Sequence, residues 1–225
     1  MDTPNKTIFE AGAIFYTEKE GKFSLFKLIK HDAEFETYHI KVYHPVDALP
    51  QKEDLAKLDV LAHHAPINQH GFENPQLLYS TPLEDDDLEG YLEYIKQIGN
   101  IDEVIQYASK YYKEAYQLGT QKEHEQAIQR YTKAIDLIPN FFEAIDNRAF
   151  AKMDLGRWAD AVEDFTLSLT VQPDSLLAIF SIGECYFKSA EYAKAKTYFE
   201  QAVALNPSHE VSQQFLAKTI AQLEP

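Results

Sequence analysis

Three prolines in the second half of the chain stand at equal intervals. Pro139, Pro173 and Pro207 are thirty-four residues apart, and residues of matching size recur at the same interval before them. The recurring positions are Ala127, Ala161 and Ala195, then Tyr131, Phe165 and Phe199, then Ala134, Ser168 and Ala202. Because several offsets agree across three units, the pattern predicts one supersecondary module used three times between residues 108 and 209. Such arrays are typical of proteins that bind other chains.

Each unit is predicted to be a helix hairpin. Apolar residues recur at helical spacing, and short turns at residues 122–124, 155–157 and 190–191 separate two helices. The small residues allow close helix packing, the aromatic residue fills the space between the helices, and the proline ends the second helix. A stack of hairpins needs a closing helix, which residues 210–223 supply. Its inward-facing residues are predicted to be Val211, Phe215, Leu216, Ile220 and Leu223.

The chain has 225 residues, and the repeat occupies only its second half, so we predict two domains, residues 1–100 and 101–225. No apolar run is long enough to span a bilayer, and the first residues lack a secretory pattern, so we expect a cytoplasmic protein. Cys185 is the only cysteine, which excludes an intrachain disulfide and predicts a buried thiol. The formal net charge of −15 argues against nucleic acid as a partner.

The first domain has the pattern of a sheet. Residues 13–16, 23–29 and 38–43 are rich in β-branched and aromatic residues, and turn signals at 18–22 and 31–34 predict an antiparallel meander. A short helix is expected at 51–58, and further strands at 60–62 and 77–80. After Pro82 the sequence predicts a helix with one apolar stripe. The fold class is therefore a small antiparallel-sheet α+β domain followed by an all-α superhelix. The residues of the stripe are Leu88, Tyr91, Leu92, Ile95 and Ile98.

Over roughly residues 108–223 the chain resembles the tetratricopeptide repeat family. The second and third units carry the resemblance, through residues 183–186, 192–195 and the inter-helix turn 155–158. The first unit departs from the family pattern at Ala115, Leu118 and Gly119, and its first helix is expected to end or bend at the glycine. This resemblance implies that the first helices of the hairpins line a groove that holds a peptide or protein segment.

The groove positions implied by the resemblance are aromatic and acidic, with one lysine. Aromatic residues give large contact area, and carboxylates favour Lys or Arg on a partner, so a basic, apolar segment is the predicted ligand. Some of the aromatic residues could instead be core residues. The predicted groove residues are Tyr112, Tyr116, Asp146, Asn147, Phe150, Asp154, Phe180, Glu184, Phe187 and Lys188.

Family members that bind acidic chaperone tails use a clamp of Lys, Asn and Arg side chains. Only Asn147 matches that clamp here, whereas the cationic and remaining amide positions are occupied by other residues. We therefore do not expect acidic tails to bind. Asn147 is predicted to donate a hydrogen bond to the backbone of the neighbouring helix rather than to a ligand. The non-matching positions are Tyr112, Tyr116, Leu177 and Ser181.

Residues of the first domain suggest other kinds of site, namely a metal site or a catalytic site. His63, His64 and His70, with Glu73, could surround a metal ion, but adjacent residues of a strand point to opposite faces, so polar surface is the preferred interpretation. The aspartates at 85–87 are explained by helix capping without a cation. No nucleophile motif or phosphate loop is present, and we predict no catalytic site, metal or cofactor.

The opening strands, with residues 12–15 and 21–23, resemble the small β-barrel domains of bacterial immunity proteins. The main prediction is a non-enzymatic adaptor that binds protein or peptide. The alternatives are a toxin-immunity type of binding protein, or a metal or enzyme site in residues 1–100. The sequence does not indicate an oligomeric state.

Overall fold

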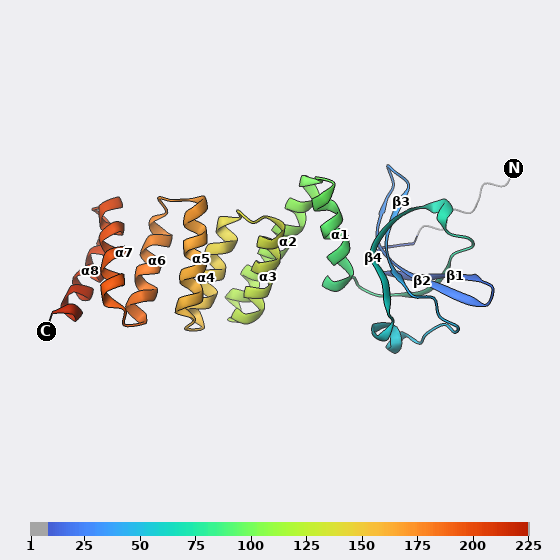
Figure 1. Ribbon diagram of the computed structural model, residues 1–225, viewed down its shortest axis with the longest axis horizontal. Coiled ribbons are helices and arrows are strands. Elements are labelled where there is room, and N and C mark those ends of the chain that lie inside the picture. The colour runs from blue at the N-terminus through green and yellow to red at the C-terminus, as the bar shows by residue number, and fades with distance from the viewer. Residues whose placement is uncertain (1–8, 225) are drawn as a thin grey trace. The chain divides into compact units, whose positions relative to one another are not determined.

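The computed structural model describes residues 9–224, and the chain divides into two compact units, residues 1–101 and residues 102–225 (Figure 1). The first unit contains a five-stranded sheet, and the second contains helices only. Each unit is described by itself below. The predicted fold class, a small antiparallel sheet followed by an all-helical array, is confirmed.

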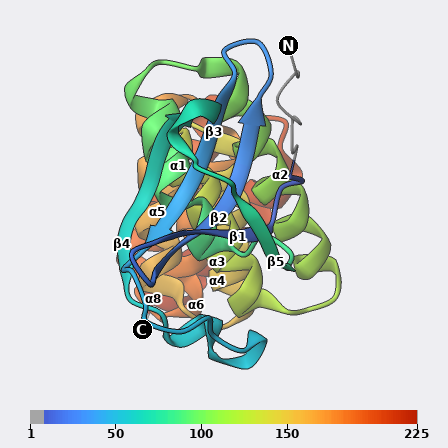
Figure 2. The ribbon, with the colours of Figure 1, turned by 90° about the vertical axis from the view of Figure 1, so that its right-hand side faces the viewer.

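The sheet of the first unit is antiparallel in all four of its strand pairings, with the strand order β4-β3-β2-β1-β5 (Figure 2). The predicted meander of three strands is present as β1, β2 and β3. A 3₁₀ helix, η1, lies where a short helix was expected, and a second, η2, spans Gln69–Gly71. The bounds are β1 Ala13–Lys19, β2 Lys22–Asp32, β3 Thr37–Tyr43, η1 Lys52–Lys57, β4 Val60–Asn68 and β5 Gln76–Ser80.

Both faces of the central strands carry buried apolar side chains, since successive side chains of a strand point to opposite sides. One face places Phe15, Leu28 and Ile40 in a core that Phe72 joins from the loop before β5. The opposite face packs another set of aromatic and aliphatic residues against η1. Because both faces of these strands are covered, apolar residues occur in nearly continuous runs in the sequence instead of alternating with polar ones. The second set includes Ile14, Leu25, Tyr43, Leu55 and Leu58.

Helix α1, Asp85–Gln97, packs on β2, β3 and β4. Leu88, Tyr91 and Ile95 are buried, as the predicted stripe requires, whereas Ile98 is 55% exposed. The prediction for Ile98 was wrong because this residue follows the last residue of the helix, Gln97, where the stripe is no longer buried. Gly90 permits the close approach, since a Cβ atom there would lie 2.7 Å from the carbonyl carbon of His63.

The second unit contains three helix hairpins and a closing helix, as the repeat predicts. The first hairpin pairs α2 with α3, the second α4 with α5, and the third α6 with α7. Gly119 lies inside α2 and does not end it; the helix continues to Thr120. The bounds are α2 Ile101–Thr120, α3 His124–Leu137, α4 Phe142–Asp154, α5 Trp158–Val171, α6 Leu176–Lys188, α7 Tyr192–Leu205 and α8 Glu210–Leu223.

The repeated small and aromatic residues form the core of the helical unit, and all nine are buried. Gly183 illustrates how tight this packing is: a Cβ atom at that position would lie 2.7 Å from the ring of Phe199. Cys185 is also buried, as predicted, and burial raises the pKa of its thiol to about 12. A thiol in that state is a poor nucleophile, so its role is packing.

The closing helix corrects one prediction. Val211, Ile220 and Leu223 are 44%, 36% and 46% exposed rather than inward-facing. The inner face of α8 instead carries Ser212 and Thr219, which are buried, with the half-buried ring of Phe215 between them. As the last helix of the stack, α8 has a neighbour on one side, so its flanks stay exposed. Across residues 9–224, no helix combines the length and apolar character needed to span a bilayer.

Candidate functional site

The predicted groove residues lie on the first helix of each hairpin, and we call the surface that they form the first-helix face. Tyr116, Asp154 and Lys188 are exposed, and Asp146 is buried. The remaining six are half-buried, which is typical of side chains at the edge of a packed core. Helix α2 carries Tyr112 and Tyr116; α4 carries Asp146, Asn147, Phe150 and Asp154; α6 carries Phe180, Glu184, Phe187 and Lys188.

A hydrogen bond joins α2 to α4 on this face. Asn147 Nδ2 donates to the hydroxyl of Tyr112 over 3.1 Å, and also to the backbone oxygen of Glu143, 2.7 Å away. The amide therefore bonds a side chain of the neighbouring helix and the backbone of its own helix, not the neighbour's backbone. The ring of Tyr112 packs against Tyr131 and Phe141. These contacts fix the position of Tyr112 before any ligand is present.

Asp146 is the least satisfied polar group on the first-helix face. It is 7% exposed, and within residues 9–224 no group forms a hydrogen bond with its Oδ1 atom. Burial raises the pKa of its carboxyl group; the nearby hydroxyl of Ser168 offsets part of this, and the charge of Glu143 adds to it. A carboxyl group in such surroundings destabilises the folded unit when it is ionised.

Two cations on the same helix are engaged elsewhere. Arg148 donates to both carboxylate oxygens of Asp164, at 2.9 and 2.7 Å, and Lys152 Nζ lies 2.7 Å from Asp164 Oδ2. Arg148 Nη1 also donates to Thr132 Oγ1, so this buried network ties α3, α4 and α5 together. This network was not predicted from the sequence.

Three aromatic groove residues belong to ring clusters inside the unit. Phe180 contacts Phe199, His209 and Phe215, with ring centroids 5.4 to 5.7 Å apart. In the same way Phe187 contacts Tyr192 and Phe215, and Phe150 contacts Phe165. These rings hold helices together, as the core alternative for them anticipated. Tyr116 of this face is 56% exposed, and Leu177, near the start of α6, is 49% exposed.

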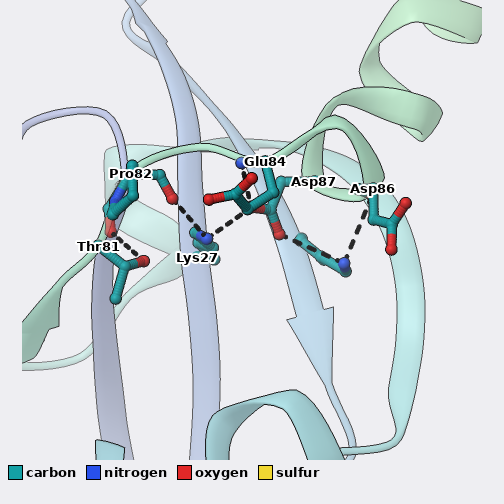
Figure 3. Close-up of polar contacts among 8 residues, drawn as sticks. Lys27, Thr81, Pro82, Glu84, Asp86 and Asp87 are labelled. Atoms are coloured by element: carbon teal, nitrogen blue, oxygen red, sulfur yellow. Dashed lines mark hydrogen bonds and ion pairs between the residues drawn. The ribbon is translucent and has the colours of Figure 1, made fainter. Parts of the chain in front are cut away.

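The first unit has a buried ion cluster that the sequence did not predict (Figure 3). Asp87, 5% exposed, pairs with the ammonium groups of Lys27 and Lys41, which are also buried. Lys27 Nζ donates to the backbone oxygen of Pro82, and Asp87 Oδ2 accepts from the backbone N–H of Glu84 at 2.9 Å. Burial alone would raise the pKa of Asp87, but these donors and charges outweigh it and lower the pKa.

The histidines of β4 do not gather as a metal site would require. His64 packs on His39 of β3 with ring centroids 5.2 Å apart, and His39 Nδ1 lies 2.9 Å from His64 Nε2. Tyr94 of α1 covers the pair. Burial and the neighbouring His39 lower the pKa of His64 to about 4. Across residues 9–224, no three His, Cys, Asp or Glu side chains are placed to hold a metal ion, and His63 and His70 are exposed.

Comparison with known proteins points to one family. A family model described as "Tetratricopeptide repeat" matches residues 177–209. The chain is 32% identical over 102 residues to small glutamine-rich tetratricopeptide repeat-containing protein 2 of Mycosarcoma maydis, which covers 45% of this chain and 29% of that protein. It is 30% identical over 142 residues to DnaJ homolog subfamily C member 7 of Mus musculus, which covers 63% of this chain and 26% of that protein.

A solved structure gives the same result. The first tetratricopeptide repeat domain of Spaghetti (RPAP3), bound to the HSP90 peptide SRMEEVD, superposes with a TM-score of 0.50 at 25% identity and covers 53% of this chain and 94% of that one. The chain spans less than a third of the length of the two curated relatives. What those whole proteins do therefore does not transfer directly to this chain.

Proposed function

Because the helical unit of this chain is a tetratricopeptide repeat domain, we propose that the protein is a cytoplasmic, non-enzymatic adaptor that binds a peptide or protein segment on its first-helix face. The observation that carries the proposal is the stack of three hairpins and a closing helix, the half of the chain that superposes on the peptide-bound relative. The sheet unit supplies a second surface for contact.

The chemistry of the first-helix face supports a basic, apolar partner. Asp154 and Glu184 add negative charge to this face against the single cation Lys188, and Tyr116 exposes apolar area. Next to these residues, α4 carries the exposed Glu143 and α6 the exposed Leu177. The peptide on the solved relative, SRMEEVD, contains three acidic residues and one arginine. A carboxylate-rich surface repels such a segment, so we propose a partner of opposite charge.

The test is affinity capture from the extract of the source cells, with the partner identified by mass spectrometry. The expected result is a protein that the wild type retains and Tyr116→Ala loses, since an exposed aromatic anchor contributes about 1–3 kcal/mol to binding. The control is Leu167→Ala, which truncates an exposed leucine on α5, a second helix of a hairpin. Equal retention by both variants, or capture of small molecules alone, would overturn the proposal.

A further inference from the structure

Four side chains at the α2–α4 junction form a compact group, which we call the α2–α4 subsite. Tyr112 and Tyr116 lie one turn apart on α2, and Glu143 and Asp146 lie about one turn apart on α4. Asn147 Nδ2 of α4 donates to the Tyr112 hydroxyl at 3.1 Å and to the backbone oxygen of Glu143 at 2.7 Å, which brings Tyr112 next to the start of α4. Burial raises the pKa values of Tyr112 and Asp146, and the charge of Glu143 adds to both shifts. Tyr116, one turn along α2, also adds to the rise in the pKa of Tyr112. The subsite therefore joins two aromatic rings to two carboxyl groups.

Tyr116, Glu143 and Asp146 can each interact with a ligand. Tyr116 is more than half exposed, and Glu143 is also exposed. Asp146 is more than nine-tenths buried; the neutral Ser168 hydroxyl lies near its carboxyl group, and its Oδ1 atom has no hydrogen-bond partner within residues 9–224. An unsatisfied buried polar group is rare and needs an explanation. Water screens a buried charge poorly, so an ionised Asp146 attracts a nearby cation more strongly than a surface carboxylate does.

We propose that the α2–α4 subsite binds one lysine or arginine side chain of the partner segment, with the cation against the Tyr116 ring and close to the carboxylates of Glu143 and Asp146. The inference rests on the proposed function, because it requires a partner segment on the first-helix face. Aromatic rings and carboxylates together attract a partly desolvated cation. Glu143 makes the direct ion pair, while Asp146 acts mainly through its charge. The arriving cation supplies the compensation that Asp146 lacks in the free protein.

Fluorescence anisotropy with matched probes tests this. The probes are short labelled peptides of leucine and serine with one central residue, which is lysine, acetyl-lysine or glutamate. The wild type is expected to bind the lysine peptide at least about tenfold more tightly than the acetyl-lysine peptide, since close charge pairs are strongly coupled. Asp146→Asn and Glu143→Gln should each remove most of that preference. Tyr116→Phe should keep it, and Tyr116→Leu should reduce it, because leucine has no π face.

The charge of the whole chain makes a matched control necessary, since a protein of net charge −15 attracts basic peptides without a specific site. Asp136→Asn removes one exposed charge from α3 and should leave the lysine preference intact. An equal effect of Asp136→Asn and Asp146→Asn would overturn the subsite. So would wild-type affinity in both Asp146→Asn and Glu143→Gln, or no binding of the lysine peptide by the wild type.

The two proposals fail in different ways. If Leu177→Ala and Tyr116→Ala abolish capture of the cellular partner while Asp146→Asn and Glu143→Gln retain it, the first-helix face binds the partner and the subsite is wrong. If Tyr116→Ala retains the partner, the proposed function itself fails. Amide hydrogen exchange of each variant confirms that the helices stay folded.

Discussion

Asp87 of the first unit and Asp146 of the second are both buried helix residues, and the two carboxyl groups have opposite surroundings. Asp87 of α1 lies between two buried ammonium groups and accepts a backbone hydrogen bond, and its pKa is lowered. Asp146 of α4 is buried to nearly the same degree, has no cationic partner within residues 9–224, and its pKa is raised by burial. Burial penalises both charges, so the difference comes from the neighbours.

The comparison separates a stabilising charge from a destabilising one. The cluster at Asp87 ties the start of α1 to β2 and β3, so its loss should be felt as unfolding. Asp146 has only the Ser168 hydroxyl of α5 near its carboxyl group to offset its burial among residues 9–224, whereas Arg148 and Lys152 of the same helix are both bound to Asp164. Natural proteins tend to accept such a loss of stability where a group is needed for binding.

The largest effect is expected from Asp87→Asn. This substitution leaves two buried ammonium groups without their carboxylate, and breaking one side of a buried ion pair costs about 3–5 kcal/mol. Chemical denaturation, followed by hydrogen exchange of the strand amides, measures the loss in the first unit. Asp86→Asn is the control, because the Asp86 side chain is exposed. Equal stability of the two variants would show that the cluster does not hold α1 on the sheet.

Much of this fold could be predicted because its signals are local or periodic. The thirty-four residue interval identifies the hairpins and the buried positions at Ala161 and Phe165, and the meander follows from strands joined by short turns. The partners of Asp87 could not be found in this way, since Lys27 and Lys41 are 60 and 46 residues away in the chain. Helix capping accounts for part of the role of Asp87, because it bonds the backbone of Glu84.

Which of the predicted groove residues are exposed is harder to predict from the sequence. A helix position that faces a groove in one repeat can belong to the core in another, depending on the ring size next to it. Phe180 illustrates this, because the bulky Phe199 and Phe215 draw it into a cluster. The sequence does not indicate that Asp146 is buried either, since a carboxylate on an amphipathic helix is normally expected on the solvent-exposed side.

The second largest effect is expected from Phe180→Ala. Because the ring packs against α7 and α8, its truncation should lower the stability of the helical unit by about 2–4 kcal/mol, slightly less than for a fully buried phenylalanine. Leu177→Ala, on the same helix but exposed, should change stability by less than about 0.5 kcal/mol. Thermal unfolding of residues 101–225 within the full chain measures both. A small effect at Phe180 would return that residue to the binding surface.

A pH effect of intermediate size is expected in the first unit. His64 has a folded pKa of about 4, below its ordinary value of 6.5. The unfolded chain therefore binds more protons between these values, and stability should fall by about 2 kcal/mol as the pH drops from 6.5 towards 4. His64→Gln should make stability much less dependent on pH between 6.5 and 4, whereas His63→Gln, at an exposed position, should not. Parallel profiles for wild type and His64→Gln would exclude His64 as the cause.

The smallest effect has the opposite sign. Asp146→Asn keeps the shape of the side chain and removes a buried charge that has no cationic partner within residues 9–224, so it should stabilise the helical unit by about 1 kcal/mol at neutral pH. A carboxyl group whose folded pKa is raised stabilises most at low pH, and that contribution is lost as the pH rises through the folded pKa. The gain from Asp146→Asn should therefore disappear below about pH 4, the ordinary pKa of an aspartate.

Urea unfolding of Asp146→Asn and of the exposed control Asp136→Asn at neutral and acidic pH checks this last prediction. If Asp146→Asn is less stable than the wild type at neutral pH, the ionised carboxylate has a stabilising role in the free protein, and the contrast with Asp87 collapses. If it is more stable yet binds the lysine peptide less well, stability and binding change in opposite directions at one residue. A packing residue would lose both together, so that result would assign Asp146 to recognition.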